Sequence, residues 1–301
     1  DYFSDEANIR IKTFLSPNFI RTPDRKGIHI FLSLLINLFL SPVYIFELLR
    51  LGIGLILDRT DFVFNHYDPI GALACRFFGL KSKQFILSHH FYLSHPSFIH
   101  PHGYEKSYFW LQWMNYIMRK TAHNVFALSF RKEKQHFNIT VVPPLIDPII
   151  RETETSTGKR DLVYFLNEGF IEEILHYYSR HPEIDADIFH KGSVKAIVPE
   201  NVIIYPHSRK KFISCLLTCK RIITTGGFDT VAEGFFHGKP VIMIPSKQHY
   251  EQYCNTIDAV RTGLAYQLDN LDELNDLDFE PYSNKRYRNW ATDQSWLDNF
   301  F

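Results

Sequence analysis

The stretch TTGGFDTVAEGFFHGKP, residues 224–240, decides the fold class of this chain. It begins inside the apolar, β-branched run RIITT at 221–225, a composition typical of a buried strand. Gly226 and Gly227 end that run, and the residues after them have the pattern of a helix of about three turns. Gly238 suits the position just past the helix, because glycine readily adopts the left-handed backbone found there. The stretch therefore predicts a strand, a turn and a helix in succession.

A second apolar run, VIMIP at 241–245, follows the helix and completes a βαβ unit with parallel strands. Ligands of such sheets bind beyond the carboxyl ends of the strands, where Gly226 and Gly227 lie, and the helix N-terminus there favours phosphate. Thr230 and Glu233 share a helix face near that end, and a carboxylate there can accept hydrogen bonds from sugar hydroxyls. This pattern indicates a nucleotide or nucleotide-sugar site. A tight structural turn followed by a solvated glutamate is the alternative.

The composition bounds the class of protein. A chain of 301 residues is long enough for about two domains. Lysine plus arginine and aspartate plus glutamate both number 33, so the formal charge is zero. That balance argues against a dedicated nucleic-acid binder, which would carry a basic excess. We therefore expect no nucleic acid among the partners.

Cysteine usage indicates reduced thiols and, with them, a cytoplasmic location. The four cysteines lie mostly in apolar contexts, and only Cys215 and Cys219 are close in sequence. Two ligands do not make a zinc site, so we expect no metal there.

Strands and helices alternate along both halves of the chain, which predicts an α/β fold with two Rossmann-like domains facing each other across a cleft. The proline-rich and then charged segment at 141–161 reads as the linker between them. We expect a first domain at 1–150, a second at 151–282 and a C-terminal helix at 283–301 that packs back toward the first domain. The opening residues, with a strand expected at 9–15, resemble the middle of a domain, so we expect the N-terminal part to be incomplete.

Residues 28–57 are strongly apolar and long enough to be considered as a membrane span. Ser33, Asn37 and Ser41 nevertheless recur every four residues and form a polar stripe on a helix, and Pro42 interrupts the run. Two core helices joined at Ser41 and Pro42 fit this pattern best. Docking on a membrane surface and spanning a membrane are the alternatives.

A basic flank supports the docking alternative. The sequence RTPDRKG at 21–27 precedes the apolar run and contains Arg21, Arg25 and Lys26. An apolar helix with a basic flank is typical of surface docking, so we expect these three side chains to be available for anionic headgroups. A possible peripheral membrane contact follows.

Residues 201–267 resemble the donor-binding half of glycosyltransferases of the GT-B fold. The branch they resemble includes the lipid II N-acetylglucosaminyltransferase and the UDP-glycosyltransferases. The resemblance covers most of residues 161–270, whereas the first domain is similar only in architecture and in DFVFNHYDPIGALACRFFGL at 61–80. It depends on a glycine pair, a threonine, a glutamate, Gly-Lys-Pro, a strand-ending proline, and a glutamine followed three residues later by asparagine. These positions are Gly226, Gly227, Thr230, Glu233, Gly238, Lys239, Pro240, Pro245, Gln252 and Asn255.

The resemblance implies that the second domain binds a nucleotide-sugar donor and the first faces the acceptor. Glu233 would bind the ribose hydroxyls, while Gly226, Gly227 and Thr230 would face the diphosphate. The loop from Asn167 to Gly169 would close over the same diphosphate.

The resemblance also implies contacts to the two ends of the donor. Gln252, with Glu251 beside it, would touch the donor sugar. The turn formed by Tyr205, Pro206 and His207 would hold the base.

The spacing of amides gives separate support for a polyhydroxyl ligand. Gln248, Gln252 and Asn255 follow an i, i+4, i+7 pattern, which places three amides on one helix face. Amides both donate and accept hydrogen bonds, as neutral hydroxyls require. A structural bond is the alternative for Asn255.

The histidine-rich stretch HHFYLSHPSFIHPHG at 89–103 follows a predicted strand of the first domain. It shows no pair of histidines at helical spacing and no nearby cysteine, so a metal site is not favoured. His90 at the strand end is a candidate general base, and Asp68 at the end of the neighbouring strand would orient it or act as the base itself. The alternative for both is a hydrogen-bonded loop residue. The Gly-rich acceptor loop of the family is not in this chain, so a base upstream of residue 1 is the further alternative.

These expectations favour an inverting glycosyltransferase, in which an acceptor hydroxyl displaces a nucleoside diphosphate from a nucleotide sugar, a UDP-sugar being preferred. The helix N-terminus after Gly227 would stabilise the leaving diphosphate without a metal ion or other cofactor. The acceptor is left open among a sugar, a lipid-linked molecule and a small molecule. The alternatives are a catalytically degenerate nucleotide-sugar-binding protein and a nucleotide-sugar epimerase of the same fold.

Overall fold

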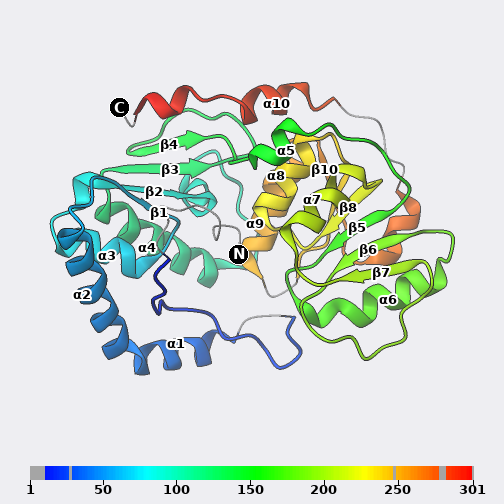
Figure 1. Ribbon diagram of the computed structural model, residues 1–301, viewed down its shortest axis with the longest axis horizontal. Coiled ribbons are helices and arrows are strands. Elements are labelled where there is room, and N and C mark those ends of the chain that lie inside the picture. Colours follow the sequence, from blue (N-terminus) through cyan, green and yellow to red (C-terminus); the bar gives the residue numbers. More distant parts are fainter. Residues whose placement is uncertain (1–10, 27–28, 247–248, 278–282, 300–301) are drawn as a thin grey trace.

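The computed structural model describes residues 11–26, 29–246, 249–277 and 283–299, which form two parallel sheets without a shared strand (Figure 1). The first sheet has the order β1-β2-β3-β4, and the second has the order β10-β9-β8-β5-β6-β7. Helices lie between most successive parallel strands, whereas irregular segments join β3 to β4 and β6 to β7. The predicted α/β architecture of two Rossmann-like domains is confirmed.

The first domain contains α1 (Ile30–Phe39), α2 (Ser41–Leu57), β1 (Val63–Asn65), α3 (Pro69–Phe77), the 3-10 helix η1 (Lys81–Lys83), β2 (Gln84–Ser88), the 3-10 helix η2 (His89–Ser94), α4 (Glu105–Thr121), β3 (Asn124–Leu128) and β4 (Ile139–Val142). Helix α5 (Pro148–Glu152) follows in the connecting segment. The second domain contains β5 (Asp161–Tyr164), η3 (Glu168–Phe170), α6 (Ile171–Arg180), β6 (Ala186–Phe189), β7 (Val202–Tyr205), α7 (Arg209–Thr218), β8 (Arg221–Thr224), α8 (Phe228–Phe236), β9 (Val241–Met243), α9 (Tyr250–Val260), β10 (Ala265–Gln267) and η4 (Leu271–Asp276). The chain then forms α10 (Lys285–Ala291) and η5 (Ser295–Asn299).

Successive side chains of a strand in the second sheet point to opposite faces, and each face packs against different helices. Ile222 belongs to the core formed with α7 and α8, whereas Ile223, the next residue of β8, belongs to the core formed with α6. Both faces of the sheet are therefore covered, which explains why its strands are continuous apolar runs rather than alternating ones.

The C-terminal segment contacts both domains. Tyr287 of α10 is buried in the core of the second domain. The indole nitrogen of Trp290 donates a hydrogen bond to the Ser129 carbonyl of the first domain at 2.9 Å. Trp296 lies farther along, with its ring centroid 5.6 Å from that of Phe126 in β3.

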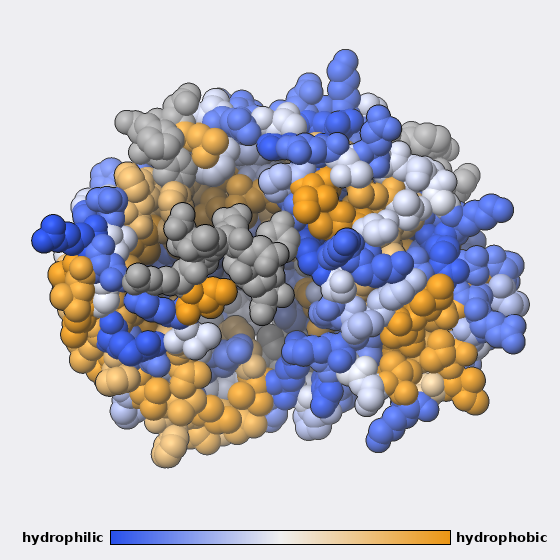
Figure 2. Space-filling model, in the orientation of Figure 1, coloured by the Kyte–Doolittle hydropathy of each residue, from blue (hydrophilic) through white to orange (hydrophobic). Residues whose placement is uncertain are grey.

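Helices α1 and α2 depart from the expectation that they are core helices. Their apolar side chains face outward, and the exposed fractions of Phe31, Leu38 and Phe39 are 74%, 72% and 84%. Figure 2 shows the hydrophobic surface gathered over these two helices at the lower left of the molecule. Among the described residues, no single helix meets the length and hydropathy of a membrane span, although α1 and α2 together do so across a 60° bend.

The polar stripe of α1 explains this orientation. Ser33 is buried, and its hydroxyl accepts a hydrogen bond from the Ile20 amide at 2.8 Å. The Asn37 side chain accepts from the Asn18 amide at 3.2 Å and donates to the Asn18 carbonyl at 2.8 Å. The stripe therefore holds the backbone of the preceding segment, and the apolar face is left on the outside. The strand expected at 9–15 does not form in the described part of that segment.

A buried ion pair joins the first residues of two central strands in the second domain. Arg221 of β8 donates from Nε and Nη2 to the two carboxylate oxygens of Asp161 in β5, at 2.8 and 2.9 Å. The Tyr178 hydroxyl donates to the same carboxylate at 3.0 Å. Asp161 is fully buried and Arg221 nearly so, so each charge needs its partner.

We predict that Arg221→Met lowers the free energy of unfolding of the second domain by about 3–5 kcal/mol, because it leaves the Asp161 charge buried without its cation. Urea unfolding followed by circular dichroism measures the change. The matched control is Arg180→Met, which removes an exposed pair with Asp272 in the same domain and should cost about 1 kcal/mol or less. Equal losses in the two variants would contradict the prediction.

Candidate functional site

The glycine pair lies between β8 and α8, at the carboxyl edge of the second sheet. Gly226 has φ +103°, and a Cβ there would lie 3.1 Å from Met243 Cε and 3.2 Å from the Gln252 carbonyl. Gly227 is the N-cap of α8 and provides no capping side chain. The first N–H groups of the helix thus remain without a side-chain cap, an arrangement suited to an anion.

Glu233 lies on α8 behind this turn and is paired with an arginine that sequence reasoning missed. Its carboxylate accepts hydrogen bonds from Arg209 Nη2 and Nη1 at 2.5 and 3.3 Å, and Arg209 also donates to Asp147 at 3.1 Å. Burial raises the pKa of Glu233, while the guanidinium acts in the opposite direction. Burial alone would lower the pKa of Arg209, but the two carboxylates raise it. Arg209 follows His207 by two residues, and only the fold brings it to Glu233.

The predicted amides form a buried hydrogen-bonded chain within the protein. Gln252 accepts from the Ser246 amide at 2.9 Å and donates to Asn167 Oδ1 at 3.2 Å. Asn255 donates to the Gly226 carbonyl at 2.8 Å, so it holds the glycine turn in place. The structural alternative for Asn255 is therefore present in the structure. Gln248, the third amide of the pattern, lies outside the described residues.

The remaining predicted donor residues lie around the same edge of the sheet. Thr230 is buried in the first turns of α8. His207 is exposed between β7 and α7, and its ring meets that of Tyr164 edge-on at 5.5 Å. Gly169 lies in η3, directly after Asn167 and Glu168.

His90 faces this group from the first domain and pairs with a carboxylate of the second. Its Nε2 lies 3.3 Å from Glu251 Oε2, and its Nδ1 lies 2.9 Å from Ser88 Oγ. Tyr67 stacks on the imidazole at 4.4 Å between ring centroids, from a backbone with φ +62° that is costly for a residue with a side chain. Burial alone would lower the pKa of His90, but the Glu251 charge raises it. The pKa of Glu251 falls to about 2, because the histidine charges outweigh its burial.

The contacts of Asp68 in the structure are those of the hydrogen-bonded alternative and not those of a group that orients His90. Its carboxylate accepts a hydrogen bond from the Gly71 amide at 2.6 Å and is the N-cap of α3. Asp68 directly before Pro69 has the sequence typical of a helix start, where a carboxylate at the N-cap accepts from the first free amides. Glu251 occupies the orienting position instead, which sequence reasoning had placed beside the donor sugar.

His89, the neighbour of His90, is buried, and its pKa is shifted in the opposite direction. Its Nδ1 lies 2.8 Å from the Leu128 carbonyl, and its ring stacks on Phe228 of α8 at 4.2 Å between centroids. Burial lowers the pKa of His89 to about 4, so the ring is neutral at pH 7. It acts as an aromatic contact between the two domains.

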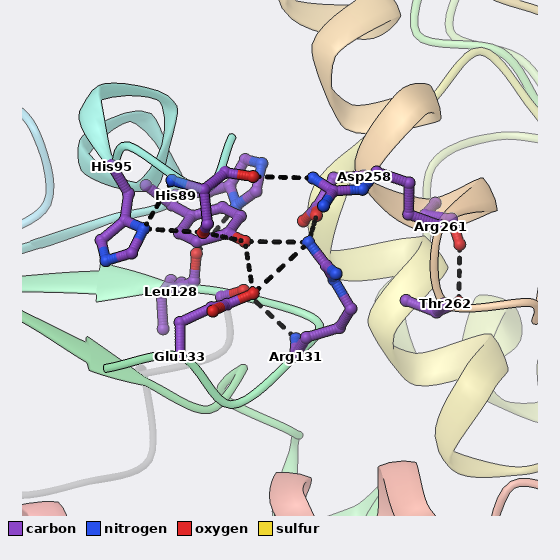
Figure 3. A network of polar contacts seen from close by, with 12 residues as sticks. His89, His95, Leu128, Arg131, Glu133, Asp258, Arg261 and Thr262 are labelled. Atoms are coloured by element: carbon purple, nitrogen blue, oxygen red, sulfur yellow. Dashed lines mark hydrogen bonds and ion pairs between the residues drawn. The ribbon is translucent and has the colours of Figure 1, made fainter. Parts of the chain in front are cut away.

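A polar network behind the histidines also joins the two domains (Figure 3). Arg131 of the first domain donates to Tyr92 at 3.0 Å and to Asp258 of α9 at 3.3 Å. Arg261 donates to the Ser97 carbonyl at 2.9 Å. Burial raises the pKa of Asp258 to about 6, while Arg131 acts in the opposite direction. The two domains are therefore also joined by this polar network.

Two further histidines of that stretch have separate partners. His95 bonds to Ser97, and His100 lies 2.7 Å from the Tyr250 hydroxyl. Within the described ranges, no three histidine, cysteine, aspartate or glutamate side chains are grouped closely enough to hold a metal ion.

Comparison with known proteins identifies relatives of this architecture. The pattern of the family described as Glycosyl transferase family 1 matches residues 100–280, more than half of the chain. The glycotransferase of kitacinnamycin shares 15% identity and a TM-score of 0.51, over 85% of this chain and 75% of that chain. UGT2 of Phytolacca americana, solved with UDP-2fluoro-glucose and pterostilbene, shares 12% identity and a TM-score of 0.56, over 87% and 80%. The calicheamicin glycosyltransferase CalG4 shares 14% identity and a TM-score of 0.51, over 94% and 76%. No curated protein matches the chain.

We predict that the pKa of His90, measured by NMR titration, lies above its ordinary value of 6.5 and falls in Glu251→Gln. Because the pKa of His90 is raised in the folded chain, its contribution to stability is complete below pH 6.5. This contribution is lost as the pH rises through the pKa that His90 has in the folded chain. The lowered pKa of Glu251 means that its contribution is present above pH 4.5 and is lost as the pH falls toward about 2. The pair is therefore strongest between pH 4.5 and 6.5. Glu172→Gln, an exposed change on α6, is the control, and an unchanged His90 titration in Glu251→Gln would refute the pairing.

Proposed function

Since the chain belongs to glycosyl transferase family 1, we propose that it moves a sugar, with inversion at the anomeric carbon, from a nucleotide-diphosphate sugar to a hydroxyl acceptor. A UDP-sugar is the proposed donor. The observation that carries the proposal is the N-terminus of α8, which follows two glycines and faces the first domain with no capping side chain. Charge that develops on a leaving diphosphate would be stabilised there by the helix dipole.

Glu233 is the proposed ribose-binding residue. Its carboxylate is buried and hydrogen-bonded to Arg209, whose own side chain is 38% exposed. Ribose hydroxyls would replace guanidinium N–H groups as donors to the carboxylate, and the arginine would move outward. This exchange keeps the buried carboxylate hydrogen-bonded in both states, as its burial requires.

His90 is the proposed general base. Glu251 would hold the proton of Nε2, so that Nδ1 could accept the proton of the acceptor hydroxyl in place of its contact with Ser88. The acceptor oxygen would attack the anomeric carbon as the bond to the diphosphate breaks. Because Glu251 raises the pKa of His90, the neutral form that would act as the base is reached at a higher pH than for an ordinary histidine.

The outward apolar face of α1 and α2 is proposed to dock on a membrane surface. Exposed aromatic side chains of α4, among them Phe109, Trp110 and Trp113, lie on the same domain and suit the interfacial region of a bilayer. The expected headgroup contacts need correction, because Arg25 and Lys26 are paired with Glu168 and Glu173. We propose a cytoplasmic enzyme, consistent with four buried free cysteines, whose acceptor is lipid-linked or lies near a membrane.

We predict that Glu233→Gln weakens UDP binding at least tenfold, because a charge-assisted hydrogen bond to ribose contributes about 1.5–3 kcal/mol. Calorimetric titration with UDP measures the affinity, and Glu172→Gln is the control that should bind as the wild type does. Equal affinity in all three proteins would remove Glu233 from the site. Donor hydrolysis and acceptor transfer, tested on UDP-, GDP- and TDP-sugars, separate an enzyme from a protein that only binds the donor.

We predict that the protein floats with anionic liposomes and that Leu38→Ser with Phe39→Ser reduces flotation severalfold, because the change removes apolar area at the bilayer boundary. The control is Ile197→Ser, which removes an apolar side chain that is even more exposed, at 92%, from the second domain. If neither the wild type nor the Ile197→Ser control floats, docking on the membrane is excluded.

A further inference from the structure

Residues 21–26, here called the strap, run from the start of α1 to the second domain (Figure 1). Arg25 Nη1 lies 2.6 Å from Glu168 Oε2, and Arg21 Nη1 lies 3.7 Å from the other oxygen of that carboxylate. Lys26 pairs with Glu173 and lies over the ring of Phe170. The strap therefore contacts the loop after β5, more than 140 residues away in sequence.

The backbone of the strap extends this contact to the amide chain. The Lys26 carbonyl accepts hydrogen bonds from Asn167 Nδ2 at 2.6 Å and from Ser246 Oγ at 2.7 Å. Asn167 in turn accepts from Gln252. One carbonyl of the first domain thus fixes the loops after β5 and β9, both of which border the proposed donor site.

Gly169 shows how closely the strap approaches. A Cβ at this position would lie 2.0 Å from the Asp24 carbonyl and 2.8 Å from Lys26 Cγ. Because the nearest atom belongs to the backbone, only glycine allows this contact. The strap alone therefore accounts for glycine at 169.

We propose that the strap, through Arg25 and the Lys26 carbonyl, positions the loop at 167–170 for donor binding, so that this loop is in place only when the two domains are closed. The inference rests on the proposed function of that loop. The Arg25 side chain is 62% exposed, so its ion pair with Glu168 contributes little to the stability of the fold. Its effect is on the position of the loop and hence on the affinity for the donor.

The test compares Arg25→Glu, Glu168→Arg and the double variant with exchanged charges, with UDP as the probe in calorimetry. We expect each single change to weaken UDP binding five- to tenfold, and the exchange to restore it to within twofold of the wild type. In donor hydrolysis, the single variants should raise KM for the donor by the same factor and change kcat less than twofold. Lys12→Glu, which breaks an exposed pair with Asp58 at 3.4 Å in the same N-terminal segment, should change neither value.

The outcomes separate the two proposals. If the wild type binds UDP and the single variants bind it equally well, the strap does not position the loop. If the single variants weaken binding and the exchange does not restore it, the two residues act separately and the proposal is overturned. Failure of the wild type to bind UDP, GDP or TDP overturns the proposed function itself. Hydrogen exchange of residues 166–170, faster in Arg25→Glu than in the Lys12→Glu control, would then still show that the strap holds the loop; equal exchange would overturn that contact too.

Discussion

The register between β5 and β8 is the constraint on which the candidate site depends. Asp161 and Arg221 begin the two strands, lie opposite each other and are joined by a buried bidentate ion pair. Three residues later Tyr164 and Thr224 are paired at the carboxyl ends. A slip of one residue would turn every inward side chain to the other face and separate the loops that follow. The charge pair at one edge of the sheet thus keeps the loop after β5 beside the glycine turn at the other.

Two glutamates of the second domain show how the surroundings, rather than the residue type, set the chemistry. Burial raises the pKa of Glu233 in spite of its arginine partner, whereas neighbouring histidines lower the pKa of Glu251. Glu233 lies among the side chains of its own domain, and Glu251 lies where the two domains meet. Because their pKa values are shifted in opposite directions, Glu233 can serve as a hydrogen-bond acceptor and Glu251 as an anion over a wide pH range. The lowered pKa of Glu251 depends on His90 of the other domain being close.

The sequence predicted the parts of the structure that depend on local patterns. The apolar runs, the glycine pair and the helix after Gly227 are short-range signals, and they located the βαβ unit. Arg209 and Glu233 are 24 residues apart, and no local signal connects them. The amides Gln252 and Asn255 were placed on the correct helix, but sequence spacing does not reveal that other parts of the protein already satisfy them. Asp68 shows the same limit of sequence patterns, because an aspartate before a proline is compatible both with a helix cap and with a catalytic base.

The orientation of α1 was hidden for a different reason. A stripe of Ser33 and Asn37 on an apolar helix is compatible with either face pointing inward, and the partner that decides it is the backbone at 18–20. A free N–H or carbonyl of an extended segment binds a hydroxyl or an amide more strongly than it binds leucine. The unusual placement of the apolar face is therefore a consequence of the irregular segment that comes before the helix.

That placement also decides how the molecule behaves in dilute solution. Soluble monomers rarely show a continuous apolar patch of more than a few hundred Å², and adjacent exposed side chains at Phe31, Leu38 and Phe39 belong to such a patch. Exposing this surface to water costs free energy, and contact with a second apolar surface lowers that cost by burying both. Two copies of the protein in water therefore attract each other through it. The colloidal stability of the pure protein thus depends on the exposed face of α1 and α2 as well as on its neutral charge. Detergent below the concentration that unfolds the domains would separate the copies, because it covers the same face.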